Sequence, residues 1–294
     1  MRVLVLGASG MLGHKVWQSV QRPPFDSRAA VRSSPRRDTL ALFPEDRVLA
    51  GYDLTHTSAV AELLEQTRPE VVINCAGVVK QVDQASDPVA QVEVNALLPH
   101  RLAALCEEYQ CRLLHFSTDC VFSGERGAYR EDDIPDARDL YGRAKMLGEV
   151  VGRRMLTIRS SIIGREIRTK HGLLEWFLSQ RGGRVKGFRH AVFSGLTTIE
   201  MARLVVRTLM EWPTLEGLYH VASRPISKYN LLLKMRDILK VEIGIDKEDD
   251  TACDRSLDGR RFSAATGYES PSWDEMLHEV AIDPTPYDAW RTVE

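Results

Sequence analysis

Short apolar runs recur along the first half of the chain. They read RVLVLG, RAAVR, RVLAGYDL, EVVINCAG, CRLLHFSTD and MLTIRSSIIG, and most are rich in Val, Ile and Leu. Helix-like stretches lie between most of them, at residues 11–20, 58–67 and 87–109. Runs that stay apolar at successive positions are typical of strands buried on both faces, and their alternation with helices indicates a parallel sheet. We therefore predict an α/β fold with a doubly wound parallel sheet of the Rossmann type.

The pattern changes after about Gly164. Strand–helix alternation fades, and the later residues hold helix-like segments at 171–180, 197–212 and 225–240. Strands are expected only at RVKGF and GLYHVAS. We predict a Rossmann domain over residues 1–165 and a smaller, mainly helical lobe over residues 166–294, with some segments of the lobe returning to the main sheet.

Composition and charge exclude several classes of protein. The chain has 294 residues, 44% of them hydrophobic and 27% charged, with a net charge of −2. This balance gives no electrostatic reason to expect nucleic acid or a membrane as partner. The longest apolar runs fall short of the roughly 20 residues that a membrane helix needs. The start, MRVLVLG, lacks the features of a signal peptide, so we expect a cytoplasmic protein. The five cysteines form no CxxC pair and suit free thiols, and the eight scattered histidines predict no metal site.

The first apolar run leads directly into GASGMLG, in which Gly7, Gly10 and Gly13 have the spacing G-x-x-G-x-x-G. A strand-to-helix turn of this kind lets the backbone approach a pyrophosphate, with N–H groups and the helix N-terminus facing the anion. Three glycines alone are a weak signal, but their place in a β-α-β unit favours dinucleotide binding. The residues predicted to bind the dinucleotide here are Gly7, Ser9, Gly10, Met11, Leu12 and Gly13.

The end of the second predicted strand indicates which dinucleotide is bound. An acid at this point favours NAD, whereas an arginine accommodates the 2′-phosphate of NADP. The sequence reads AAVRSSPRR, with Arg32 directly after the strand and no acid before Asp38. We therefore predict NADP(H), with Arg32 on the 2′-phosphate; a basic surface loop is the alternative. The ends of the third and fourth strands would add Asp53, Leu54, Cys75, Ala76 and Gly77 to the cofactor site.

The segment DLYGRAKMLGE carries a tyrosine and a lysine four residues apart. On a helix, Tyr141 and Lys145 would lie on one face with Cβ atoms roughly 5–6 Å apart. Taken alone, the segment is better interpreted as an ordinary surface helix. Whether the pair has a chemical role depends on other residues, above all the strand end STD, whose Thr118 precedes Tyr141 by 23 residues.

These motifs together resemble those of the extended short-chain dehydrogenase/reductase family. The resemblance rests on GASGMLG, DLT, NCAG, VNALLP, FSTDCVFSG, YGRAKMLGE and RSSIIG, in the family's order and spacing over nearly the whole chain. Within the family, STDCVFSG followed by YGRAKMLGE is most similar to the dTDP-4-dehydrorhamnose reductase branch. That resemblance implies NADPH-dependent reduction of a 4-keto-6-deoxy nucleotide sugar, in deoxysugar and surface polysaccharide biosynthesis.

The resemblance also implies the roles of three catalytic residues. Tyr141 would donate a proton to the sugar carbonyl oxygen, and Thr118 would hold the same oxygen. Lys145 would bind the nicotinamide ribose, and its ammonium is expected to lower the pKa of Tyr141 from about 10. Ser117 is the weaker candidate for the strand-end hydroxyl, and a capping role is the alternative for Thr118. The cofactor-binding set therefore includes Tyr141 and Lys145 as well.

Cys120 marks a departure from the nearest branches. Related 4,6-dehydratases carry Thr-Asp-Glu where this chain has Thr118, Asp119 and Cys120, so dehydration would lack one proton-transfer group. The reductase branch usually has an aromatic residue at this point. GDP-fucose synthase, which epimerises its keto-sugar before reducing it, has a cysteine there and a histidine before a later helix. The matching residues would be Cys120 and His171, with thiol and imidazole pKa values near 8.5 and 6.5; a buried thiol and a surface histidine are the favoured alternative.

The substrate site is expected to use residues from both halves of the chain. The residues predicted to bind the nucleotide sugar are Lys80, Thr118, Asp119, Cys120 and Arg255. Arg255 is the favoured diphosphate ligand in DRSLDGRRF, because a guanidinium gives bidentate recognition, although a solvated charge run remains the alternative. Two other functions stay open: a non-catalytic, NADP-binding regulatory subunit, and a reductase of small carbonyl compounds. A homodimer is also left open.

Overall fold

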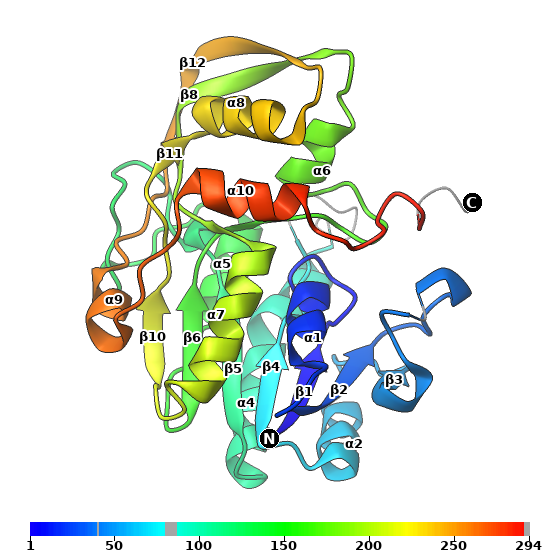
Figure 1. The fold of residues 1–294 in the computed structure, drawn as a ribbon. Helices are drawn as coiled ribbons and strands as arrows, with labels where there is room; N and C mark the ends of the chain where they lie inside the picture. Colours follow the sequence, from blue (N-terminus) through cyan, green and yellow to red (C-terminus); the bar gives the residue numbers. More distant parts are fainter. Residues whose placement is uncertain (40, 80–86, 291–294) are drawn as a thin grey trace.

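Seven parallel strands form the central sheet, in the spatial order β10-β6-β5-β4-β1-β2-β3 (Figure 1). The computed structural model describes residues 1–39, 41–79 and 87–290. The strands are β1 (Arg2–Leu6), β2 (Asp26–Val31), β3 (Val48–Ala50), β4 (Val71–Asn74), β5 (Arg112–Ser117), β6 (Met155–Arg159) and β10 (Gly217–His220). The predicted doubly wound parallel sheet is therefore confirmed.

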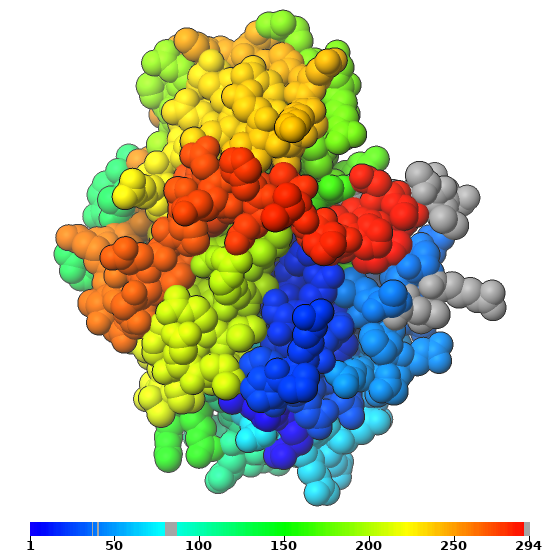
Figure 2. Space-filling model, viewed as in Figure 1, coloured from blue at the N-terminus to red at the C-terminus, as the bar shows by residue number. Residues whose placement is uncertain are grey.

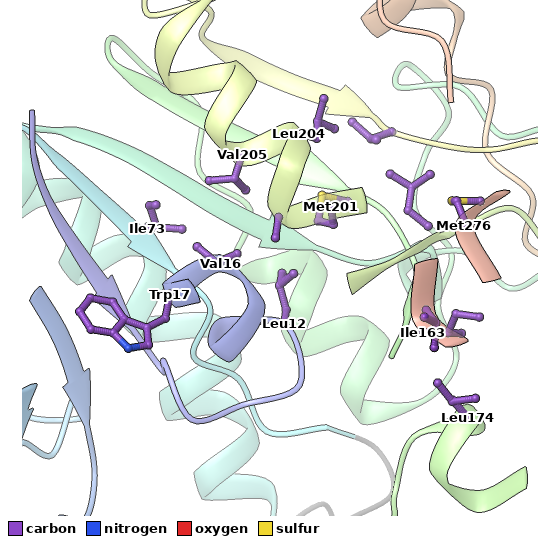
Figure 3. Packing of buried hydrophobic residues seen from close by; sticks show 14 of the residues in the cluster. Leu12, Val16, Trp17, Ile73, Ile163, Leu174, Met201, Leu204, Val205 and Met276 are labelled. Atoms are coloured by element: carbon purple, nitrogen blue, oxygen red, sulfur yellow. The ribbon is translucent and has the colours of Figure 1, made fainter. Parts of the chain in front are cut away.

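Both faces of this sheet are buried, which explains the continuous apolar runs. In β1, Val3 and Val5 belong to one hydrophobic cluster, whereas Leu4 and Leu6 belong to another on the opposite face. Successive side chains of a strand point to opposite faces, so a strand between two cores must be apolar at every position. Figure 3 shows the first cluster, which includes Leu12, Val16 and Trp17 near the glycine turn and Met201, Leu204 and Val205 of a long helix.

Helices cover the two faces in the manner that β-α-β units require. One face carries α1 (Gly13–Val20) and α7 (Thr198–Met210), and the other carries α2 (Thr57–Thr67) and α4 (Leu98–Glu108). The helix predicted over 87–109 forms as α3 (Pro88–Gln91), a π-helical turn (Val92–Leu97) and α4 in direct succession. In the π turn, Asn95 donates to the Val78 carbonyl (2.8 Å) and accepts from the Val78 N–H (3.1 Å). This pair fixes the chain just after β4.

The later half of the chain builds an upper lobe around a three-stranded sheet of order β11-β8-β12 (Figure 1). Its elements are α6 (Leu173–Leu178), β8 (Arg184–Phe193), β11 (Ile226–Ser227), α8 (Lys228–Leu239), β12 (Gly244–Asp254) and α10 (Trp273–Ala281). The short strands β7 (Ile162–Ile163) and β9 (Leu196–Thr197) pair with each other, and α9 (Arg260–Thr266) follows the upper sheet. Strand β10 does return to the main sheet, beside β6. The division at residues 165 and 166 stays a prediction.

Strand β12 was not expected from the sequence. Its residues, GIDKEDDTACD, include several acids and lack the apolar pattern of a half-buried strand. The strand pairs with β8 along an exposed edge, where Lys186 contacts Glu248 (3.1 Å) and Arg189 contacts Asp249 (3.4 Å). Charged residues of β12 thus have their partners on β8. The local sequence of β12 does not indicate this pairing.

Candidate functional site

The predicted site residues gather at the carboxyl ends of β1, β4 and β5. The strand order reverses between β4 and β1, since β2 and β3 lie on one side of β1 and β4, β5 and β6 on the other. Ligands of open α/β sheets bind at such a switch point, outside the carboxyl ends of the strands. The glycine turn follows β1, NCAG continues from β4, and Thr118 follows β5.

The glycine turn has the close contacts that a dinucleotide cradle requires. Gly7 has a φ of +70°, and a Cβ there would lie 2.7 Å from the amide nitrogen of Ala76. A Cβ on Gly13 would collide with the carbonyl oxygen of Gly7. The Gly10 N–H donates to that same oxygen (3.0 Å), which closes the turn. The backbone is therefore shaped as a pyrophosphate site needs, and the residues present fit a dinucleotide.

Arg32 and Asp53 lie near each other at the ends of β2 and β3. Hydrogen bonds from Thr55 lower the pKa of Asp53, and the positive charge of Arg32 acts in the same direction. Both side chains are exposed. Leu54 is partly buried against the hydrophobic cluster of α2 and α4. The pair thus stands where the adenosine ribose is predicted to bind.

The segment after β4 lies between the glycine turn and α5 (Leu140–Leu147). The Asn74 side chain accepts from the Ala76 N–H (3.1 Å) and holds the turn that follows the strand. Burial raises the pKa of the Cys75 thiol, and the nearby charge of Lys145 opposes that rise. A Cβ on Gly77 would lie 3.3 Å from Asn95 Oδ1. The predicted Lys80 lies outside the described residues.

Tyr141 and Thr118 meet across the site. Asp139 caps α5 by accepting from the Gly142 N–H (2.9 Å), which places Tyr141 in the first turn of the helix. Thr118 lies close enough to the Tyr141 phenol to lower its pKa slightly against the larger effect of burial. The Thr118 hydroxyl accepts from the Cys120 N–H (3.1 Å) and donates to Asp119 Oδ1 (3.1 Å). Thr118 therefore caps the turn that follows β5 and lies beside Tyr141.

The pKa of Tyr141 is raised, in the direction opposite to the one expected from the sequence. Burial is the main cause, and the neighbouring Cys120 and Asp119 add to it. The Lys145 ammonium donates to the Phe116 carbonyl (2.6 Å), and burial lowers its pKa to about 8. The predicted lowering of the Tyr141 pKa by Lys145 is therefore wrong for this structure, because loss of solvent around the phenol outweighs the charge one helical turn away.

Sequence reasoning missed a buried ion pair beside Lys145. Both oxygens of Glu149 accept from Arg159 at the end of β6, each at 2.7 Å, and the Ser117 hydroxyl donates to Glu149 at 2.6 Å. The charge of Glu149 raises the pKa of Lys145 against the effect of burial. The four-residue spacing of Tyr141, Lys145 and Glu149 was the available signal, although α5 ends at Leu147 and Glu149 follows it. Ser117 thus bonds away from Tyr141, as its lower ranking implied.

Arg255 reaches from the end of the upper sheet to the turn that follows β5. Its Nε donates to the Phe122 carbonyl (2.9 Å), and Nη1 lies 3.8 Å from Cys120 Sγ. Burial raises the pKa of Asp119, while the charges of Arg255 and Lys228 oppose the rise. An adjoining cavity of about 380 Å³ is lined by Ser123, Gly124, Glu125, Arg138, Asp139, Ala252 and Arg255. The structure therefore brings together Thr118, Asp119, Cys120, Tyr141 and Arg255.

The pKa of Cys120 differs from the ordinary thiol value used for the epimerase alternative. Burial and the charge of Asp119 raise the pKa of Cys120 to about 12, so the thiol stays protonated near neutral pH. His171 is exposed, and the next residue, Gly172, lies beside the glycine turn: a Cβ on it would be 3.2 Å from Met11 Sδ. The assumed thiol pKa near 8.5 is therefore corrected.

A protein-family model described as the RmlD substrate binding domain matches residues 1–283. The chain belongs to this family. The resemblance to the dTDP-4-dehydrorhamnose reductase branch is thereby confirmed, and relatives that share the RmlD region are named as reductases.

Three curated relatives illustrate the range of proteins that the RmlD-family chain resembles. A probable low-salt glycan biosynthesis reductase, Agl14, of Haloferax volcanii is 35% identical over 150 residues, 51% of this chain and 48% of that protein. A dTDP-4-dehydrorhamnose reductase of Streptomyces griseus is 36% identical over 149 residues, which are 50% of this chain and 43% of that protein. The methionine adenosyltransferase 2 subunit beta of Xenopus laevis is 30% identical over 150 residues, which are 50% of this chain and 41% of that protein. The matched region spans less than half the length of each of these relatives.

A solved structure supports the fold. The dTDP-4-dehydrorhamnose reductase of Bacillus anthracis in complex with NADP superposes with a TM-score of 0.78 at 20% identity, over 95% of this chain and 98% of that one. Over the ranges 1–39, 41–79 and 87–290, no helix is long and apolar enough to cross a membrane. Within the same described residues, no group of three or more His, Cys, Asp or Glu could hold a metal ion.

Proposed function

We propose that this protein is an NADPH-dependent reductase of a 4-keto-6-deoxy nucleotide sugar, working in deoxysugar and surface polysaccharide biosynthesis. The placement of Tyr141 beside Thr118 carries the proposal, because it brings a proton donor to a second hydroxyl at the edge of the sheet that holds the glycine turn. The names of the relatives in Streptomyces griseus and Haloferax volcanii support the reaction class. The NADP complex of the structural neighbour supports the cofactor.

The position and protonation state of Tyr141 allow it to act as a general acid in a reduction. NADPH, when bound, supplies the hydride that reaches the carbonyl carbon. Tyr141 remains a protonated phenol at neutral pH and can donate its proton to the carbonyl oxygen as negative charge develops there. Thr118 lies beside the phenol and would orient the same oxygen. Once the proton has left, the Lys145 ammonium one turn away stabilises the phenolate.

Arg255 is the basic group that we expect to meet an anionic substrate near the turn after β5. Arg255 and Arg138 line the cavity of about 380 Å³ together with Glu125 and Asp139, and Arg138 is paired with Glu125. Lys228 lies close enough to oppose the raised pKa of Asp119. A guanidinium can bind a diphosphate through two parallel hydrogen bonds. Arg255 is already held by the Phe122 carbonyl, so its position costs little ordering when a substrate binds.

A panel of keto-sugars tests the proposal. The purified protein is mixed with NADPH and 4-keto-6-deoxy sugars carried on dTDP, UDP, GDP or CDP, and nicotinamide absorbance is followed. We expect oxidation of NADPH with at least one member of the panel, and loss of that signal in Tyr141→Phe. Oxidation with none of the sugars, or equal rates in the variant, would overturn the proposal.

A regulatory subunit is the second candidate, because one relative is a subunit of methionine adenosyltransferase. A protein of that kind would bind the dinucleotide without turning it over. NADPH binding without oxidation in the whole panel would favour this function. Tyr141 and Thr118 would then have only a structural role in the site.

A further inference from the structure

The last described residues of the chain, 283–290, pack against α1, the helix that begins at the glycine turn. Figure 2 shows this red segment lying between the blue N-terminal part and the upper lobe. Tyr287 is 2% exposed and Trp290 6%, so these two side chains are buried while the prolines between them and Asp283 are exposed. The family model ends at residue 283, and Thr285, Tyr287 and Asp288 therefore lie beyond the matched part of the chain.

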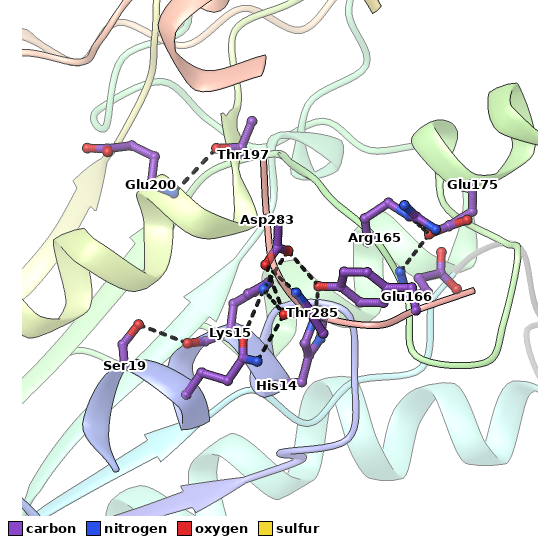
Figure 4. Close-up of polar contacts among 12 residues, drawn as sticks. His14, Lys15, Ser19, Arg165, Glu166, Glu175, Thr197, Glu200, Asp283 and Thr285 are labelled. Atoms are coloured by element: carbon purple, nitrogen blue, oxygen red, sulfur yellow. Dashed lines mark hydrogen bonds and ion pairs between the residues drawn. The ribbon is translucent and has the colours of Figure 1, made fainter. Parts of the chain in front are cut away.

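Ion pairs and hydrogen bonds hold this segment on two sides. Lys15 of α1 contacts Asp283 at 2.6 Å, with both side chains less than a tenth exposed, and donates to the Thr285 hydroxyl at 2.8 Å (Figure 4). On the other side, Arg165 donates to Asp288 at 2.9 Å, and its guanidinium lies 4.7 Å from the centre of the Tyr287 ring. A buried pair of this geometry fixes the position of the segment, since breaking it would leave an uncompensated charge.

His14 connects the segment to the glycine turn. The ring Nδ1 lies 2.9 Å from the Gly10 carbonyl oxygen, and Nε2 lies 2.7 Å from the Tyr287 hydroxyl. A carbonyl can only accept, so Nδ1 carries the proton. Burial lowers the pKa of His14 to about 4, so near neutral pH Nε2 has no proton and can accept from the Tyr287 hydroxyl. That hydroxyl also lies 3.1 Å from Asp283 Oδ2, so its one proton is shared between the ring and the carboxylate. The contact with Tyr287 thus holds the ring in the orientation that bonds Gly10.

The bond to Gly10 determines the direction of the next amide group. The peptide between Gly10 and Met11 is planar, and in a trans peptide the C=O and N–H point to opposite sides. His14 holds the Gly10 oxygen with two donors, its own backbone N–H (3.0 Å) and its ring Nδ1 (2.9 Å). Holding that oxygen toward the helix turns the Met11 N–H away from it. This is the orientation in which a backbone amide at a helix N-terminus can meet an anion.

We infer that Tyr287 is a positioning residue for the dinucleotide site, acting through His14 to fix the Gly10–Met11 peptide. The contacts from Tyr287 through His14 to Gly10 stand on the structure alone. Their effect on NADPH binding rests on the proposed function. The C-terminal segment 283–290 then supports the cofactor site through His14. Its anchors on Lys15 and Arg165 keep Tyr287 in place.

Two measurements on Tyr287→Phe test the inference. Hydrogen–deuterium exchange of the segment 7–14 in the free protein reports on the turn itself, and NADPH titration by nicotinamide fluorescence reports on binding. We expect faster exchange in that segment and a dissociation constant for NADPH about three- to tenfold higher, as for loss of one hydrogen bond. At saturating NADPH, kcat should stay within about twofold, since no reacting group is changed.

Tyr268→Phe is the matched control. Tyr268 is also buried, and its hydroxyl donates to Glu200 at 2.9 Å, far along the chain from the turn. This variant should leave exchange of 7–14 and NADPH affinity unchanged. His14→Asn, whose side-chain amide can still donate to Gly10, should bind NADPH more tightly than His14→Leu.

Each outcome decides a separate point. Unchanged exchange of 7–14 in Tyr287→Phe, or an equal change in Tyr268→Phe, overturns the inference. Faster exchange with unchanged NADPH affinity overturns the link to the cofactor. Wild-type protein that does not bind NADPH refutes the proposed function and the cofactor link with it, while the exchange result still decides whether Tyr287 positions the turn.

Discussion

Gly142 lies against the backbone of Cys120, so closely that a side chain on Gly142 would collide with the Cys120 carbonyl oxygen. The same added carbon would also come within 2.7 Å of the Ala137 Cβ. Because nothing larger than hydrogen fits there, α5 can approach the turn that follows β5. That approach brings Tyr141 beside Thr118.

Gly142→Ala should therefore impair turnover with little effect on the cofactor site. The added methyl group has to push α5 away from the turn, and a shift of about 1 Å at a reacting group can cost about 100-fold in rate. We expect a loss of about 10- to 100-fold in kcat. Gly152→Ala is the control, because its nearest neighbour, Met155 Sδ, would be at an ordinary 3.4 Å. Equal kcat in the two variants would contradict the argument.

Tyr141→Phe removes the proposed proton donor and leaves the glycine turn and Arg32 intact. General acid catalysis commonly contributes about 10²- to 10⁴-fold, so most turnover should be lost. Fluorescence titration should show NADPH binding close to that of the wild type. A kcat within about twofold of the wild-type value would rule out Tyr141 as the acid.

Arg32→Ala should discriminate between the two nicotinamide cofactors. Only NADPH carries the 2′-phosphate, and a charge-assisted hydrogen bond of about 1.5–3 kcal/mol corresponds to a tenfold or greater loss of affinity. Dissociation constants for NADPH and NADH are compared in the same titration. Arg22→Ala removes the same charge near the opposite end of β2 and should change neither value. An equal loss for both cofactors would make Arg32 a structural residue.

Stability should fall as the pH drops from about 6.5 toward 4. Burial lowers the pKa values of His14 and His220 to about 4, so the unfolded chain binds protons in this range that the folded protein does not. Each fully buried histidine then costs about 2 kcal/mol of unfolding free energy by pH 5. Urea titrations at pH 7 and pH 5 measure the difference. Equal midpoints would show that these rings do not control acid stability.

Solvent deuterium tests the epimerase–reductase alternative. With its pKa raised to about 12, the Cys120 thiol is a poor base at neutral pH. We expect no deuterium at C3 or C5 of the keto-sugar during reduction in deuterated water by the wild type. Uptake in the wild type that is lost in Cys120→Ser would instead establish proton exchange by this thiol.

The sequence by itself determined the features that depend on local geometry. Strands buried on both faces have to be apolar at every position, so β1, β4 and β5 could be predicted without their neighbours. Gly7 needs a positive φ and Gly13 a close contact, and both constraints act within a few residues. The helical spacing of Tyr141 and Lys145 is likewise local. These features sufficed to predict the parallel sheet and the glycine turn.

Only the tertiary structure decided which groups face each other and how they titrate. The contact between His14 and Tyr287 joins residues 273 positions apart, and Glu149 meets Arg159 only because α5 ends beside β6. Strand β12 forms because β8 supplies its hydrogen bonds and counter-charges. The raised pKa of Tyr141 depends on how many neighbours exclude water from its hydroxyl. Desolvation is a property of the packed surroundings, and no spacing in a sequence specifies it.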